Sequence, residues 1–275
     1  MEPMFGRLIT AMITPFTPDG ALDLDGAVAL ASWLVEQGND GLVLAGTTGE
    51  SPTLTHDEQI ALVEAVSGAV DCHVIAGAGS NDTAAAVELT RRCSAAGADA
   101  ILTVTPYYNR PSQLGLFNHF RSVAEATDLP VMLYDIPPRS GRKIHTDTIL
   151  RLADEVPNIV AVKDAAGDVA ETARLVAASP AGFEVYSGED SLTLALLAVG
   201  VVGVVSVASH WATPETVVMM EAFFSGDVAA ATEANRRLIP SWDFESGDLT
   251  PNPIPSKAMM KALGMPGGDC RPPMG

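Results

Sequence analysis

The sequence predicts a mixed α/β protein in which strands and helices alternate along the chain. Apolar runs of roughly 4–6 residues alternate with alanine-rich amphipathic stretches of roughly 10–16 residues, which is the pattern of repeated βα units. Eight such apolar runs occur before the pattern changes. Eight units in about 225 residues favour a TIM (β/α)8 barrel, although a doubly wound sheet would have a similar pattern.

The eight predicted strands are short and continuously apolar. Runs of this kind are typical of parallel strands that are buried on both faces. In chain order they are Ile9–Thr14, Gly41–Ala45, His73–Gly77, Ala100–Thr105, Pro130–Tyr134, Ile159–Lys163, Glu184–Ser187 and Gly203–Val207.

Capping signals support several of the helices between these strands. Thr55 lies three residues before Glu58, as in a capping box, and Gly38 and Gly97 follow two of the helical stretches. Pro214 suits the first turn of a helix that ends near residue 225. The clearest amphipathic segments are Leu24–Gln37, Thr55–Val70, Thr83–Ala96 and Ser112–Ala126.

The strand pattern ends near residue 227. Residues 1–226 are therefore predicted to form the barrel that carries the active site, and residues 227–275 a C-terminal helical extension. Within this extension Asp227–Leu238 and Ser256–Leu263 are predicted helices, joined by a proline- and asparagine-rich link at 251–255. The Gly/Pro-rich end stops abruptly at Gly275 and is compatible with a trimmed C-terminus.

Composition and charge argue against several classes of partner. A net charge of −18 leaves few cations to neutralise nucleic-acid phosphates or to bind an anionic membrane. No uncharged apolar run reaches the ~18 residues that a membrane span needs, and no secretory signal is visible. The three widely spaced cysteines predict reduced thiols and a cytoplasmic location. The five scattered histidines lack ligand spacing, so no metal site is expected.

Lys163 is the most informative residue, because four apolar residues of the sixth predicted strand run directly into it. Burying an ammonium is costly, so a lysine in this place either reaches solvent or has a lowered pKa. A neutral amine in a closed site attacks a carbonyl and forms a Schiff base. On this segment alone, a lysine that extends to water is the commoner interpretation.

Other polar residues follow the remaining strands, at the end where TIM barrels carry their catalytic groups. Taken singly, each is most simply a turn hydroxyl, a packed aromatic or a surface charge. Together with Lys163 they predict a site in which phenols transfer protons and an arginine holds a carboxylate. The segments are Gly46–Ser51, Thr105–Pro111, Tyr134–Gly141, Ser187–Gly188 and Val205–Ser206.

From about residue 8 to residue 263, the chain resembles the dihydrodipicolinate synthase (4-hydroxy-tetrahydrodipicolinate synthase) family of pyruvate-dependent class I aldolases. The most specific motifs are Thr-Pro-Tyr-Tyr-Asn-Arg-Pro at 105–111 and Tyr-Asp-Ile-Pro-Pro-Arg-Ser-Gly at 134–141. The resemblance implies a lyase that condenses pyruvate with L-aspartate 4-semialdehyde in lysine and diaminopimelate biosynthesis. It further implies that no cofactor is needed, and that the protein is a homotetramer built as a dimer of dimers.

The resemblance also implies catalytic roles. Lys163 matches the Schiff-base lysine, and Tyr134 matches the tyrosine that relays protons near the imine. Thr47 and Tyr108 match the partners of Tyr134 in this relay, with Tyr108 reaching the site across a dimer interface. Tyr107 matches a tyrosine that packs at that interface.

Four further positions match substrate-binding groups. Thr48 matches a contact of the pyruvate carboxylate, with backbone groups at Gly188 and Val205 nearby. Arg139 matches the group that holds the carboxylate of the aldehyde. Two alternatives stay open: a pyruvate-dependent aldolase for a sugar acid or keto acid, and a non-catalytic barrel that binds a keto acid. Arg139 favours a short carboxylated aldehyde over a polyhydroxyl chain.

The effector positions depart from those of lysine-inhibited relatives. Gln59 stands where these relatives have a histidine or another basic residue, and Ala85 stands where they have a glutamate. Ser51, His56 and Asn81 are retained. We therefore expect weak inhibition by lysine, or none.

Overall fold

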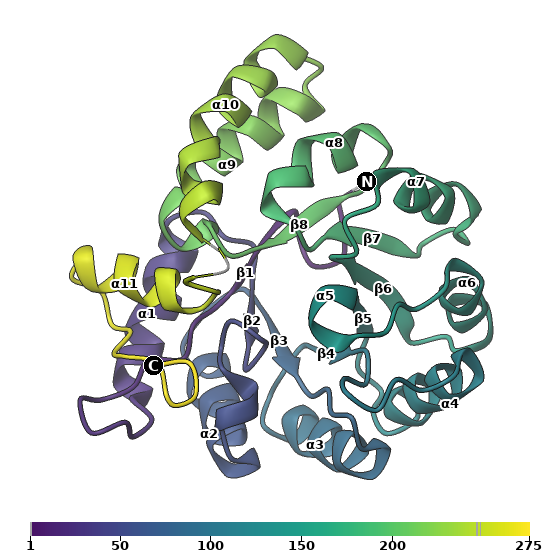
Figure 1. The fold of residues 1–275 in the computed structure, drawn as a ribbon, viewed down its shortest axis with the longest axis horizontal. Coiled ribbons are helices and arrows are strands. Elements are labelled where there is room, and N and C mark those ends of the chain that lie inside the picture. The colour runs from purple at the N-terminus through teal and green to yellow at the C-terminus, as the bar shows by residue number, and fades with distance from the viewer. Residues whose placement is uncertain (1, 246, 248) are drawn as a thin grey trace.

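A closed ring of eight parallel strands forms the centre of the molecule in the computed structural model, which describes residues 2–245, 247 and 249–275 (Figure 1). Each strand pairs with the next in sequence, and β8 pairs back with β1. The predicted barrel is confirmed, and the doubly wound alternative is wrong. The strands are β1 Leu8–Ala11, β2 Gly41–Leu44, β3 His73–Gly77, β4 Ala100–Val104, β5 Val131–Asp135, β6 Ile159–Asp164, β7 Glu184–Ser187 and β8 Gly203–Ser206.

Helices cover the outside of this ring. The capping box of Thr55 and Glu58 is present at the start of α2. Gly38 and Gly97, predicted to follow the ends of two helices, have positive φ of 107° and 94°, as glycines in that place commonly do. The helices are α1 Leu24–Glu36, α2 His56–Ser67, α3 Thr83–Ala95, α4 Gln113–Ala124, α5 Pro137–Ser140, α6 Thr146–Glu155, α7 Val169–Ala178, α8 Thr193–Ala198, α9 Ser209–Phe224, α10 Val228–Glu245 and α11 Ile254–Ala262.

The helix α9 agrees with the prediction, whereas α10 is longer than predicted. The helix α9 begins at Ser209, but Ala212 is non-helical, so Pro214 does lie in the first turn of its regular part. The helix α10 continues to Glu245 rather than ending at 238, although Pro240 lies inside it. Its apolar face packs along α9 through Leu238 and its neighbours, and this packing outweighs the helix-breaking preference of proline.

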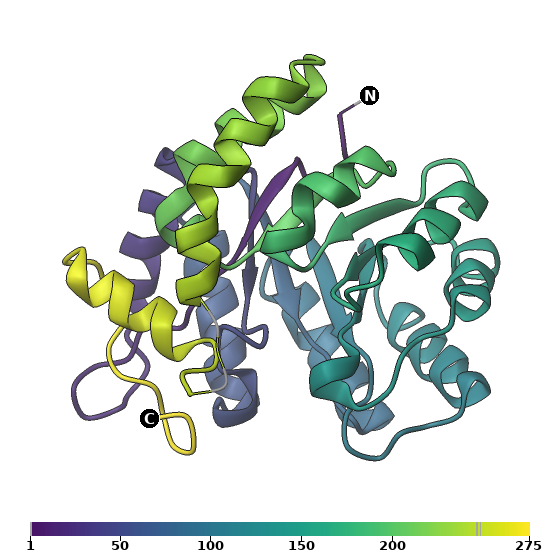
Figure 2. The ribbon, with the colours of Figure 1, turned by 45° about the horizontal axis from the view of Figure 1, so that its top comes forward.

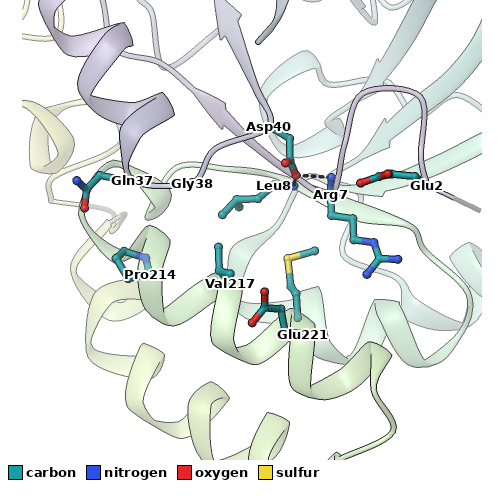
Figure 3. Close-up of a pocket in the computed structure, with 10 residues that line it drawn as sticks. Glu2, Arg7, Leu8, Gln37, Gly38, Asp40, Pro214, Val217 and Glu221 are labelled. Atoms are coloured by element: carbon teal, nitrogen blue, oxygen red, sulfur yellow. Dashed lines mark hydrogen bonds between the residues drawn. The ribbon is translucent and has the colours of Figure 1, made fainter. Parts of the chain in front are cut away.

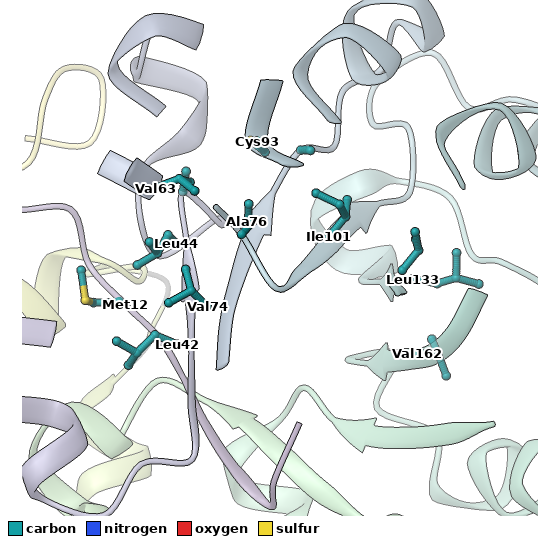
Figure 4. Packing of buried hydrophobic residues seen from close by; sticks show 14 of the residues in the cluster. Met12, Leu42, Leu44, Val63, Val74, Ala76, Cys93, Ile101, Leu133 and Val162 are labelled. Carbon is teal, nitrogen blue, oxygen red and sulfur yellow. The ribbon is translucent and has the colours of Figure 1, made fainter. Parts of the chain in front are cut away.

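The core has two layers, because successive residues of a strand point to opposite sides. Outward side chains of the strands pack against the surrounding helices (Figure 4). Inward side chains fill the barrel, and these include Met132 and Tyr134 of β5 and Ala161 of β6. Lys163 is two positions beyond Ala161, so the same alternation directs its side chain into the barrel interior.

The C-terminal region brings late sequence back to the barrel. The helices α9 and α10 extend side by side beyond the ring, whereas α11 and the yellow tail lie on the side of α1 and α2 (Figure 2). Arg271 of the tail forms an ion pair with Glu58 of α2 at 2.6 Å. Among the described residues, no helix combines the length and the apolar character that crossing a bilayer requires.

Candidate active site

Lys163 lies near the C-terminal end of β6 and is buried, with 5% of its surface exposed. Its Nζ lies 4.4 Å from the centre of the Tyr134 ring on the neighbouring strand, where the two residues are paired in register. Burial lowers the pKa of Lys163 to about 8, the nearby Asp190 carboxylate opposes this shift, and Arg139 adds to it. A substantial fraction of neutral amine is therefore present near neutral pH, as a nucleophile requires.

Gly188 makes room for this lysine. A Cβ on Gly188 would lie 3.0 Å from Cγ and 3.1 Å from Cε of Lys163, and only 2.8 Å from Cβ of Ala165. The backbone N–H of Gly188 donates to the carbonyl of Asp164 at 2.7 Å, so the glycine is fixed directly beside the lysine stem. The glycine after β7 is thus required by the close approach of β6.

Tyr134 supplies a protonated phenol next to the amine. Burial raises its pKa to about 12, while the Arg139 charge and a side-chain interaction with Thr47 act in the opposite direction. Tyr134 and Thr47 line the same small hollow of about 30 Å³. The phenol therefore keeps its proton at neutral pH and can donate it to a group that is bound above Lys163.

Two larger cavities open beside Thr47 toward Arg139. One, of about 220 Å³, is also lined by Tyr107, Ile136 and Ser140. The other, of about 230 Å³, is closed by residues of the C-terminal region. Thr47 lines all three hollows, and Arg139 lines the two larger ones, so the hollows adjoin one another around Thr47. Tyr134, whose ring lies against the Lys163 amine, lines the smallest of them.

The loop that carries Arg139 is held at both ends. Asp135 accepts hydrogen bonds from Nζ of Lys143 at 2.9 Å and from the N–H of Ile144 at 3.0 Å, which closes the segment between them. Arg139 donates through Nη2 to the backbone carbonyl of Asn252 at 3.2 Å. This arrangement leaves the rest of the exposed guanidinium available to an anion at the cavity mouth.

Thr48 is buried next to Thr47 and contacts the C-terminal region. Its Oγ1 accepts a hydrogen bond from Nδ2 of Asn252 at 2.8 Å. Val205 of β8 is also buried in the barrel interior. Asp190 fixes the chain just beyond Val205, because its carboxylate accepts from the N–H of Val207 at 2.7 Å and of Ala208 at 3.3 Å.

Tyr108 lies outside the site of its own chain. It is 90% exposed and adopts a positive φ of 73°. Tyr107, by contrast, lines the cavity beside Arg139. Within one chain, Tyr134 and Gly188 lie beside Lys163, and Thr47 lines the same hollow as Tyr134. Thr48 is linked to Arg139 through Asn252, whereas Tyr108 lies apart from these residues.

Two acidic residues and one amide near the site were not predicted. Asp190 and Glu245 both act on the charge of Lys163, and Asn252 connects Thr48 to Arg139. The one local signal was for Asp190, which belongs to an acidic pair, Glu189-Asp190, directly after the Ser187-Gly188 turn. The sequence around Asn252 indicated only a loop.

A further hollow, of about 860 Å³, lies at the opposite end of the barrel (Figure 3). Asp40 is engaged there by the N–H groups of Arg7 and Leu8, and the Arg7 guanidinium lies 3.7 Å from the centre of the Phe224 ring. Catalytic groups of such barrels lie at the C-terminal end of the strands, so this hollow is not the candidate site. Across the described parts of the chain, no cluster of three or more His, Cys, Asp or Glu is placed to hold a metal ion.

A buried lysine of lowered pKa inside a (β/α)8 barrel, with a phenol against its amine, defines a lyase of the class I aldolase type. A sequence model described as the dihydrodipicolinate synthetase family matches residues 4–275. The chain belongs to this family. Its activity is that of a 4-hydroxy-tetrahydrodipicolinate synthase, an enzyme of lysine biosynthesis.

Individual relatives agree over almost the whole chain. A 4-hydroxy-tetrahydrodipicolinate synthase of Moorella thermoacetica is 52% identical over 272 residues, which are 98% of this chain and 92% of the relative. A crystal structure of the Cyanidioschyzon merolae synthase with lysine bound has a TM-score of 0.96 at 45% identity, covering 99% and 93% of the two chains. The chloride-inhibited Acinetobacter baumannii synthase complexed with pyruvate has a TM-score of 0.93 at 35% identity, with the same coverage.

Proposed function

We propose that this enzyme condenses pyruvate with L-aspartate 4-semialdehyde through an imine on Lys163. The observation that carries the proposal is the buried Lys163 amine, with its pKa lowered to about 8, lying 4.4 Å from the centre of the Tyr134 ring. The Acinetobacter relative described as complexed with pyruvate supports the first substrate.

The chemistry follows from the two groups. The neutral Nζ of Lys163 attacks C2 of pyruvate, and loss of water leaves an iminium. The iminium acidifies the methyl group, whose deprotonation gives an enamine that attacks the aldehyde carbon. The amine of the second substrate then displaces Lys163 by attacking C2, which closes the ring and frees the enzyme. Tyr134, with Thr47, is placed to move protons at the imine.

The substrate carboxylates are assigned by charge and position. Thr48 and the backbone groups at Gly188 and Val205 are proposed to bind the carboxylate of pyruvate, close to Lys163. Arg139 is proposed to bind the carboxylate of the aldehyde at the mouth of the cavity. Planar guanidinium groups hold carboxylates with paired hydrogen bonds, which suits a short carboxylated aldehyde.

A second copy of the chain is proposed to complete the site. Tyr108 is 90% exposed and Leu114, six residues further along the chain, is 61% exposed, which is costly for large side chains left in water. We propose a homotetramer built from two dimers, in which Tyr108 of one subunit joins the proton relay of the other. A cytoplasmic location is proposed as well, in keeping with the free thiols of all three cysteines.

A comparison of substrates tests this function. The enzyme is assayed with pyruvate and L-aspartate 4-semialdehyde, and separately for aldol cleavage of sugar acids. We expect turnover only in the first assay. Turnover of a sugar acid at a comparable kcat/KM would instead support an aldolase of wider range, and inactivity in both assays would contradict the proposal.

A further inference from the structure

Asn252, in the link between α10 and α11, contacts both of the residues that are proposed to bind substrate carboxylates. Its Nδ2 donates to Oγ1 of Thr48 at 2.8 Å, and its backbone carbonyl accepts from Nη2 of Arg139 at 3.2 Å. Asn252 is buried, with 7% of its surface exposed. Thr48 and Arg139 come from the loops after β2 and β5, so Asn252 is a bridge between two sides of the cavity.

The direction of the Asn252 amide is fixed by a third residue. Ser256, in the first turn of α11, is fully buried and donates its hydroxyl hydrogen to Oδ1 of Asn252 at 3.0 Å. With the carbonyl end of the amide engaged in this way, its NH₂ end faces Thr48.

This direction determines what the Thr48 hydroxyl can do. A hydroxyl has one hydrogen and two acceptor lone pairs. Because the amide donates to a lone pair of Thr48, the hydroxyl hydrogen is not used on Asn252. It stays available to donate to an anion in the cavity, where a charged acceptor gives the stronger hydrogen bond.

A buried ion pair holds the same two segments together. Nζ of Lys257 in α11 lies 2.6 Å from Oε1 of Glu50, two residues after Thr48 in the loop that follows β2, and both side chains are almost fully buried. The backbone N–H of Arg271 donates to the other oxygen of Glu50 at 2.9 Å. The Lys257–Glu50 ion pair and the Arg271 hydrogen bond therefore hold the two segments together beside the contact between Asn252 and Thr48, which does not depend on one loop alone.

We propose that Asn252 is a positioning residue that directs the Thr48 hydroxyl hydrogen toward the carboxylate of pyruvate. The inference rests on the proposed role of Thr48 in binding that carboxylate. It gives the C-terminal region a defined part in substrate binding, because this donor comes from beyond the barrel strands.

The test uses the full-length enzyme and pyruvate alone. Borohydride traps the imine on Lys163, and the trapped fraction is measured by mass spectrometry against pyruvate concentration. We expect Asn252→Leu, which removes the donor and excludes water, to raise the half-saturating pyruvate concentration about tenfold. Asn252→Ala, which admits a water in place of the amide, should raise it about threefold and also serves if the leucine variant does not fold.

A double-mutant cycle separates positioning from general damage. In a Thr48→Val background, where no hydroxyl remains to be directed, replacement of Asn252 should cause no further increase in the half-saturating concentration. Asn158→Ala is the matched control, since Asn158 donates to three backbone carbonyls at the opposite end of the barrel. This control should lower the melting temperature and leave the pyruvate dependence unchanged.

Two results would overturn the inference while leaving the proposed function intact. One is normal pyruvate dependence in both Asn252 variants. The other is an equal increase with and without the Thr48 hydroxyl, which would make Asn252 a structural residue only. If the parent enzyme gave no adduct on Lys163 at any pyruvate concentration, the proposed function itself would fail.

Discussion

The Nζ of Lys163 lies over the ring of Tyr134 at 4.4 Å from its centre, on two strands that pair these residues in register. A ring face favours the charged form of an amine, whereas burial favours the neutral form. The pKa of Lys163 is lowered to about 8, so burial dominates. Near neutral pH the amine is therefore neutral in a larger fraction of molecules than an exposed lysine would be.

The first prediction concerns the pH dependence of the covalent step. At limiting pyruvate, the rate of borohydride-sensitive adduct formation on Lys163 should rise with pH and level off above about 8, because only the unprotonated amine attacks. Peptide mapping of the adduct checks the position. A rate that still rises beyond pH 10, or an adduct on Lys143, would mean that a lysine other than Lys163 reacts.

The second prediction concerns proton transfer. Tyr134→Phe should lower kcat by about 10²–10⁴, the range for loss of a general acid–base group. Tyr108→Phe and Thr47→Val should also lower kcat, and the losses should be non-additive if the three act as one relay. Steady-state kinetics of the single and combined variants decide this. Near-normal turnover of Tyr134→Phe would remove the phenol from the mechanism.

The third prediction concerns the second substrate. Arg139→Ala should raise KM for the aldehyde much more than KM for pyruvate, because a paired carboxylate contact is lost at the cavity mouth. Arg139→Lys should restore little, since a point charge does not reproduce the planar fork. Equal effects on the two substrates would indicate that Arg139 only supports the loop.

The fourth prediction concerns inhibition by lysine. Gln59 is buried and donates to the carbonyl of Ser51 at 3.2 Å, and Ala85 offers no carboxylate to an ammonium. Lysine should therefore inhibit weakly or not at all, because its charge finds no partner there. Initial rates measured across lysine concentrations provide the check. Strong inhibition below about 1 mM, a free energy of about −4 kcal/mol or better, would contradict this interpretation of the pocket.

The fifth prediction concerns stability. Lys257→Met should lower the free energy of unfolding by about 3–5 kcal/mol, because it leaves the Glu50 carboxylate buried without its partner. Adding Glu50→Gln should recover part of this loss. Urea denaturation of the parent, the single variant and the double variant measures both effects. A loss below about 1 kcal/mol would show that the pair is not buried in solution.

Local signals accounted for much of the fold and for Lys163. An apolar run that ends in a lysine is visible within a single strand, as is the capping box of Thr55 and Glu58. The contact of Asn252 was not predictable in this way, because its partner Thr48 is 204 positions away. The sequence around Asn252 indicates only a loop. The length of α10 was missed for a similar reason, since packing on α9 decides it and the local proline argues against it.

The closing of the barrel has a consequence for the order in which the protein is made. The strand β1 pairs with β8, with Ile9 opposite Val205, so the ring cannot close until nearly 200 further residues have left the ribosome. During that time β1 presents an unpaired edge, which is the form of chain that aggregates most readily. Asn252 and Lys257 emerge later still. The end of the cavity that is proposed to bind pyruvate is therefore among the last parts of the molecule to form during synthesis.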